Sequence, residues 1–172
     1  MKTFRIIGLI LIGACTIQAC DKDDIDEGDE TEFVSKAASS NMFEIESGKL
    51  AASAAKGARA EVKNYGNMMI ADHTAATIEL QAVAEQNGIA MPTSMNEEHR
   101  AMYNDLNARS GADFDRVYAQ MMVDSHQRTV NLFEEAADDL DDPEIKKFAQ
   151  DKIPVLKMHL DHAVTLKNTV NP

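Results

Sequence analysis

A helical period of apolar residues runs through four long stretches of the chain, and this pattern constrains the fold more than any other feature. The stretches cover approximately residues 31–56, 60–87, 113–140 and 143–169, and each places its apolar side chains on one face. No stretch alternates apolar and polar residues as a half-buried strand would. Because the connections are short or of modest length, the sequence predicts an all-α fold, an antiparallel four-helix bundle.

Capping residues and helix breakers predict the boundaries of the helices, including a short helix between the second and third long ones. Ser94 and Glu97 have the spacing of a capping box, which predicts a helix from Ser94 to about Arg109. The last long helix is expected to open with Asp142 as its N-cap and Pro143 at its first position. The expected bundle therefore has one additional short helix.

The charge of the chain argues against nucleic acids as partners. The 172 residues carry 17 Lys and Arg against 29 Asp and Glu, a net charge of −12 at pH 7. A surface this acidic repels phosphate backbones, so we expect no nucleic-acid partner. The sequence also lacks the glycine-rich phosphate loops and the nucleophile elbow that mark common enzyme folds.

The first twenty residues have the pattern of an export signal. A basic start, residues 1–5, precedes an apolar run over residues 6–14. This run is too short for a transmembrane helix, which needs roughly 20 apolar residues. The two cysteines of the chain, Cys15 and Cys20, follow the apolar run, and each resembles the acylated cysteine of a bacterial lipobox.

An acidic tract over residues 21–30 favours Cys20 over the alternative, Cys15, as the lipidated residue. We therefore predict a lipoprotein signal peptide over 1–20 with lipidated Cys20, a disordered acidic tether over 21–30, and a helical domain over 31–172. An acidic stretch after the cysteine also resembles the export signal of some outer-membrane lipoproteins. The expected location is the bacterial envelope, with the membrane reached through the lipid anchor. An ordinary signal peptide with incidental cysteines is the alternative.

Each long helix places one potential metal ligand on its apolar face. At about 100° per residue, Glu44, His73 and His159 fall within the apolar stripes, and His126 falls at the edge of one. We expect Glu44 and His73 to be buried close together. The fifth histidine, His99, lies in a polar context on the short helix and is expected to face solvent.

Two interpretations of these four inward residues remain open. Three imidazoles and the Glu44 carboxylate suit a single Zn, Cu or Fe ion, because these metals accept nitrogen and oxygen donors. Alternatively, the histidines form a polar layer without metal and hydrogen-bond to Glu44, Tyr65 or Tyr118. A buried carboxylate is costly unless it is paired, coordinated or protonated, so Glu44 needs a partner in either case.

Short motifs spread over all the helices also resemble a known family. They are Phe33–Ala38, Glu44–Ala51, Met69–Thr74, Gly111–Tyr118, His126, Ile153–Pro154 and His159–Leu160. In this order they resemble the domain-of-unknown-function family 4142, over about residues 32–166. The resemblance implies a ferritin-like helical bundle in a bacterial envelope protein, and it implies no activity.

The residues themselves argue against the di-iron chemistry of many ferritin-like proteins. A di-iron site needs Glu-x-x-His on two helices and a further Glu on each of the other two. The residues three positions before the inward histidines are Ile70, Val123 and Leu156, so Glu44 is the single carboxylate that fits. We therefore expect no dinuclear site.

The predicted function is that of a lipid-anchored envelope protein without enzymatic activity, in a structural, stress-related or partner-binding role. The alternative is a metal-binding or metal-buffering protein that uses the four inward residues for a mononuclear site. An enzyme is disfavoured because no separate acid, base or nucleophile accompanies the cluster. The sequence identifies no protein partner.

Overall fold

The computed structural model describes residues 27–171, which form five α-helices and one short 3-10 helix. The helices are α1 (Glu27–Ala52), η1 (Ala54–Lys56), α2 (Ala60–Gln86), α3 (Glu97–Asn107), α4 (Gly111–Asp139) and α5 (Pro143–Val170). No strand occurs among the described residues, so the prediction of an all-α fold is confirmed.

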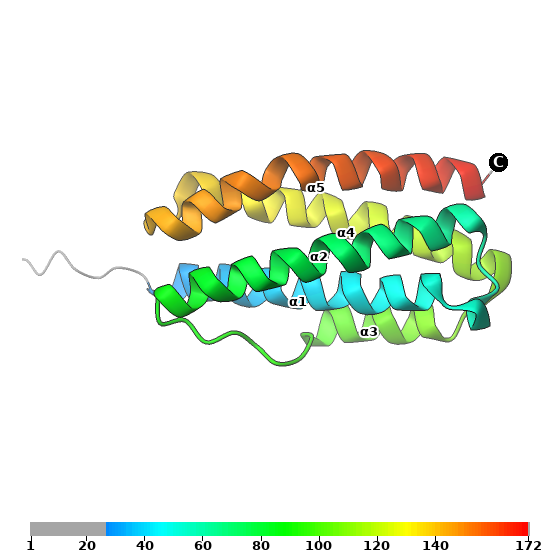
Figure 1. Cartoon of the computed structure of the whole chain (residues 1–172), viewed down its shortest axis with the longest axis horizontal. Helices are drawn as coiled ribbons and strands as arrows, with labels where there is room; N and C mark the ends of the chain where they lie inside the picture. The colour runs from blue at the N-terminus through cyan, green and yellow to red at the C-terminus, as the bar shows by residue number, and fades with distance from the viewer. Residues whose placement is uncertain (1–26, 172) are drawn as a thin grey trace, which may run out of the picture.

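The long helices lie side by side as a bundle of two pairs. α1 packs mainly on α2 and α4 packs mainly on α5, and within each pair the helices run in opposite directions (Figure 1). The shorter α3 lies along α1 and returns the chain to the start of α4 (Figure 1). Contacts between the two pairs, α2 with α5 and α1 with α4, are far fewer than those within each pair, so the pairs meet along looser seams.

The N-terminal boundary differs from the prediction. α1 begins at Glu27, so the last four residues of the predicted tether are helical. The reason is a tertiary contact: Glu30 is buried, and its Oε1 accepts hydrogen bonds from the backbone amides of Asp141 (3.1 Å) and Asp142 (3.3 Å) in the turn between α4 and α5. The predicted signal peptide and both cysteines lie outside the described residues. None of the described helices is long and apolar enough to cross a membrane.

Two helix starts test the capping predictions. At α5 the prediction is confirmed, because the Asp142 side chain accepts hydrogen bonds from the amides of Glu144 and Ile145 and Pro143 occupies the first turn. At α3 the prediction was wrong. The N-cap is Asn96, whose Oδ1 accepts the amide of His99 at 2.8 Å, and the helix starts at Glu97 rather than Ser94. Asn is an equally good N-cap.

Two glycines let α1 and α2 approach each other closely. A Cβ atom added to Gly48 would lie 2.7 Å from the carbonyl oxygen of Gly66, and one added to Gly66 would lie 2.8 Å from the carbonyl oxygen of Gly48. Any side chain at either position would push the backbones apart. The close approach helps bring the middle of α1 against the part of α2 that carries His73.

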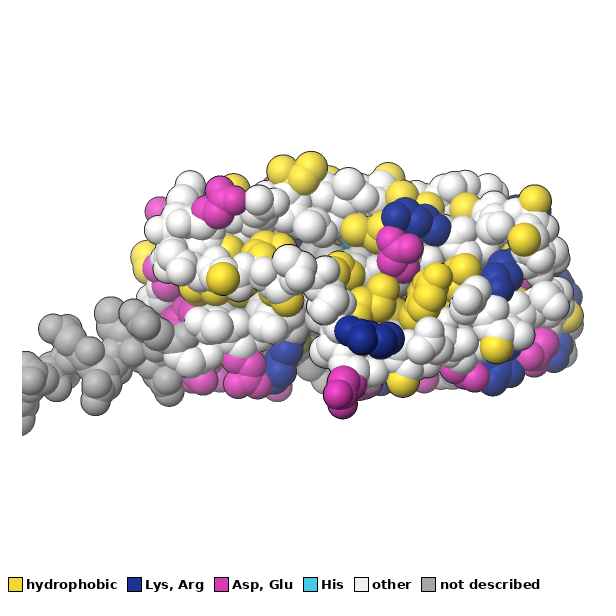
Figure 2. All heavy atoms as spheres, turned by 90° about the horizontal axis from the view of Figure 1, so that it is seen from below, with side chains coloured by type: hydrophobic (Ala, Val, Ile, Leu, Met, Phe, Trp, Pro, Cys, Tyr) yellow, Lys and Arg dark blue, Asp and Glu magenta, His cyan; other side chains and the backbone are white. Residues whose placement is uncertain are grey.

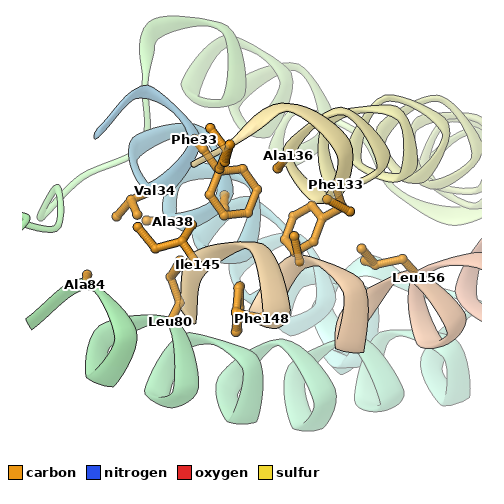
Figure 3. Close-up of a cluster of buried hydrophobic side chains, with 14 of the residues drawn as sticks. Phe33, Val34, Ala38, Leu80, Ala84, Phe133, Ala136, Ile145, Phe148 and Leu156 are labelled. Carbon is orange, nitrogen blue, oxygen red and sulfur yellow. The ribbon is translucent and has the colours of Figure 1, made fainter. Parts of the chain in front are cut away.

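The core consists of two apolar clusters with polar residues between them. One cluster gathers phenylalanines and aliphatic residues around Phe33, Phe133 and Phe148 (Figure 3). The other surrounds Phe114 and Tyr118. Between them, each long helix contributes buried polar side chains, namely Asn41, Glu44, His73, Ser125, His126 and His159. This polar layer is the part of the interior in which chemistry is expected.

Candidate metal centre

Three histidines from three different helices meet in the polar layer. His73 on α2, His126 on α4 and His159 on α5 each place one ring nitrogen within 4.8 Å of the others. Their ring centroids are 5.7 Å (His73–His126), 5.5 Å (His73–His159) and 5.4 Å (His126–His159) apart. Their exposed fractions are 3%, 1% and 1%. The face shown in Figure 2 agrees with this burial, because almost no histidine surface is visible there.

A hydrogen bond on the outer nitrogen holds each imidazole. The Nδ1 of His73 donates to the Oδ1 of Asn41 at 2.9 Å, and the Nδ1 of His126 donates to the backbone oxygen of Met122 at 2.9 Å. The Nε2 of His159 donates to the Oδ2 of Asp72 at 2.8 Å. Each bond fixes the tautomer of its ring, so that the other nitrogen carries the lone pair.

The remaining nitrogens of the three rings have no hydrogen-bond partner in the protein. They are the Nε2 of His73, the Nε2 of His126 and the Nδ1 of His159, and all three are buried. Buried polar atoms are nearly always paired, so three unpaired lone pairs in one place need an explanation. Metal-bound histidines have this arrangement, with one nitrogen on the ion and the other fixed by an outer hydrogen bond.

The histidines are neutral at pH 7. Burial lowers the pKa of His73 well below its usual value, and the neighbouring imidazoles of His126 and His159 lower it further. Burial also lowers the pKa of His126 to about 4. For His159, burial lowers the pKa although the hydrogen bond to Asp72 acts in the opposite direction. Neutral imidazoles keep their lone pairs available to a cation.

Glu44 lies beside the three histidines and outside the group of converging nitrogens. Its Oε1 accepts a hydrogen bond from the Oγ of Ser125 at 2.6 Å and lies 3.9 Å from the Nδ1 of His126, the nitrogen that faces away from the group. Burial raises the pKa of Glu44 to about 8, so the carboxyl is mostly protonated at pH 7. Glu44 and His73 are both buried, as predicted, while the contacts of the Glu44 carboxyl run to Ser125 and His126, so its closeness to His73 stays a prediction.

The predicted metal-free polar layer is incomplete within the described residues. Tyr65 donates its hydroxyl to the backbone oxygen of His159 at 3.1 Å, not to an imidazole ring. The hydroxyl of Tyr118 and the Oε2 of Glu44 have no hydrogen-bond partner in the protein. The three imidazole lone pairs are therefore not paired with any of the predicted partners Tyr65, Tyr118 and Glu44.

The prediction for His99 was wrong. Its side chain is half-buried rather than solvent-facing, because its Nδ1 lies 2.7 Å from the Oγ of Ser39 and its ring stacks on Phe43 at a centroid distance of 5.4 Å. His99 thus fastens α3 to α1 and takes no part in the three-histidine group.

Sequence reasoning missed the residues that fix the rings, above all Asn41 and Asp72. Asn41 lies three residues before Glu44 on the same face of α1, and this spacing could have identified Asn41 as a second inward polar residue. Asp72 directly precedes His73, yet its hydrogen bond is to His159 on another helix. The sequence holds no signal for that pairing.

Comparison with known proteins places the chain in a family. A family model described as "Domain of unknown function (DUF4142)" matches residues 17–166, which is most of the 172-residue chain. No curated protein and no solved structure matches it. The chain therefore belongs to the family described as Domain of unknown function (DUF4142).

Proposed function

We propose that this protein binds one transition-metal ion in the middle of its bundle, through the Nε2 of His73, the Nε2 of His126 and the Nδ1 of His159. One observation carries the proposal. One ring nitrogen of each histidine lies within 4.8 Å of the others, and each ring has one buried nitrogen without a hydrogen-bond partner while its opposite nitrogen is held by Asn41, Met122 or Asp72.

The donor set indicates which metals fit. Three neutral imidazoles without a thiolate suit Zn²⁺, Cu²⁺ or Fe²⁺, whereas Mg²⁺ and Ca²⁺ prefer oxygen ligands. Glu44 is an outer residue in this proposal and not a ligand, because it lies on the Nδ1 side of His126. A metal centre with three protein ligands keeps at least one coordination position for another molecule.

We further propose that the domain is a ferritin-like four-helix bundle, with α3 as an addition, and that it is held at the bacterial envelope by a lipid on Cys20. The basic and apolar start of the sequence and the acidic tract after Cys20 support the anchor. Metabolic labelling with a radioactive fatty acid tests it. Label should be lost in Cys20→Ser and retained in Cys15→Ser, and the opposite result would make Cys15 the anchor.

Elemental analysis of the full-length chain, purified without chelator and then equilibrated with Zn²⁺, Cu²⁺ or Fe²⁺, tests the metal site. We expect close to one ion per chain. His73→Ala/His159→Ala should abolish binding, and His162→Ala, which removes an exposed histidine from the same helix as His159, should retain it. A folded wild-type chain that takes up none of these ions would overturn the proposal.

A further inference from the structure

A small cleft between α2 and α5 leads from the surface to two of the three histidines, His73 and His159. Its volume is about 180 Å³, and its lining includes His73, His159, Asn41 and Asp72. The side chain of Asp72 is 42% exposed, yet it holds the ring of His159. Because Asp72 contacts both solvent and His159, the three-histidine group lies close to the surface at this seam.

The charges around the cleft favour an anion once a metal is present. Asp72 is bonded to His159, and Glu79 is paired with Lys152 at 2.5 Å between the Oε2 and the Nζ. Lys152 is only 17% exposed and also lies over the ring of Phe148. The lining therefore carries two negative charges and one positive charge. A divalent ion on three neutral imidazoles would add two positive charges and make the total positive.

The size and walls of the cleft restrict what can enter. Since a water molecule occupies about 30 Å³ of liquid, about six waters would fill the cavity. Phe133, Leu156 and Val155 form apolar walls, and Ala76 lines the α2 side. The space suits a species of a few heavy atoms and excludes a nucleotide, a sugar or a peptide.

From this geometry we infer that the α2–α5 cleft admits a small inorganic monoanion to the open coordination position of the ion held by His73, His126 and His159. The inference rests on the proposed metal site. Three protein ligands leave a position for an exogenous ligand, and the cleft is the opening that reaches two of the three. An anion there would neutralise charge in an interior where charge is poorly screened.

Azide titration of the Co²⁺-loaded, full-length protein tests the inference, because the visible spectrum of Co²⁺ responds to a change of ligand. Wild type should show a saturable spectral change while Co²⁺ remains bound, as checked by elemental analysis after gel filtration. Ala76→Leu, which fills the cleft, should weaken azide binding or slow its entry at least tenfold and leave Co²⁺ affinity within a few fold. Ala71→Leu, at an exposed position of the same helix, is the matched control and should behave as wild type.

Val155→Phe narrows the cleft from the α5 side and replaces Ala76→Leu if that variant fails to fold. Bound Co²⁺ without any spectral response to azide would overturn this inference and leave the metal site standing. Failure to bind Co²⁺ at all would instead overturn the metal site. Unchanged azide binding in folded cleft-filling variants would show that the anion arrives by another route, which would also overturn the inference.

Discussion

Asp72 on α2 and His159 on α5 form a hydrogen bond of 2.8 Å across one of the two seams between the helix pairs. The bond fixes the His159 ring and leaves its Nδ1 buried without a hydrogen-bond partner. Outer carboxylates of this kind also raise the basicity of a metal-bound imidazole. In the proposed metal site Asp72 is therefore a positioning residue and not a ligand.

Replacing Asp72 should weaken metal binding without unfolding the protein. Loss of an outer carboxylate usually lowers metal affinity about 10- to 100-fold, and we expect Asp72→Asn to do the same. Competition with a chromophoric chelator measures the affinity. Asp161→Asn, which changes an exposed acid on α5, is the control for the loss of one negative charge. Equal affinities in both variants would contradict the role assigned to Asp72.

His126→Leu should abolish metal binding and leave the metal-free protein as stable as wild type, or more stable. The substitution removes the unpaired Nε2, and the Met122 oxygen retains its place in the backbone ladder of α4. An unpaired buried polar group costs about 1–3 kcal/mol, so up to this amount can be recovered.

His73→Leu makes the matched comparison, because it would leave the buried Oδ1 of Asn41 without its hydrogen bond. We expect this variant to be less stable than His126→Leu by about 1–3 kcal/mol. Urea unfolding of the metal-free chains gives both values. Equal stabilities would show that the Asn41 contact contributes little.

The stability of the metal-free protein should be greatest near pH 7. The histidines have pKa values below the ordinary 6.5 in the folded state, and burial lowers the pKa of the half-buried His99 as well. Below pH 6.5 the unfolded chain therefore binds more protons, and stability falls as pH falls. Glu44 acts in the opposite direction, because its pKa rises from 4.5 to about 8 on folding. Between pH 4.5 and 6.5 the several histidines outweigh this one carboxyl.

Above about pH 7 the Glu44 effect is the largest among these groups, because the histidines of the unfolded chain have by then lost most of their protons. The Glu44 carboxyl of the folded chain keeps a proton up to about pH 8 that the unfolded chain has lost, so stability should fall by up to about 1 kcal/mol between about pH 7 and 9. Glu44→Gln keeps an acceptor for Ser125 and removes the titration, so it should flatten this fall. Chemical unfolding at a series of pH values, with chelator present, measures the effect. A wild-type fall that persists in Glu44→Gln would assign it to another group.

Glu30→Ala should destabilise the bundle at the turn between α4 and α5. It would leave the amides of Asp141 and Asp142 without the carboxylate oxygen that they share, at a cost of about 1–3 kcal/mol. Glu32→Ala, which removes an exposed acid from the same helix, should change stability by less than about 0.5 kcal/mol. Thermal unfolding of both variants decides whether Glu30 has this role.

The helices and the inward histidines could be predicted because both follow from a period of 3.6 residues. A helical wheel gives the direction of a side chain and says nothing of its height along the bundle or of which ring nitrogen faces a neighbour. For this reason Glu44 was grouped with the three histidines, although it lies on the outer side of His126. The start of α1 was missed for a similar reason, because Glu30 finds its partners 111 and 112 residues further along the chain.

The close contact between Gly48 and Gly66 affects the geometry of the proposed metal site, although both glycines lie away from it. Gly66 lies seven residues, or about 10 Å along the helix axis, before His73. Because a helix is stiff over two turns, a methyl group at Gly66 would shift the His73 ring relative to the rings on the opposite pair of helices. Metal–nitrogen bonds of about 2 Å tolerate errors of only a few tenths of an ångström. The small size of Gly48 and Gly66 therefore sets the distances between the three histidines, and the fit of the proposed site to an ion depends on two residues outside the site.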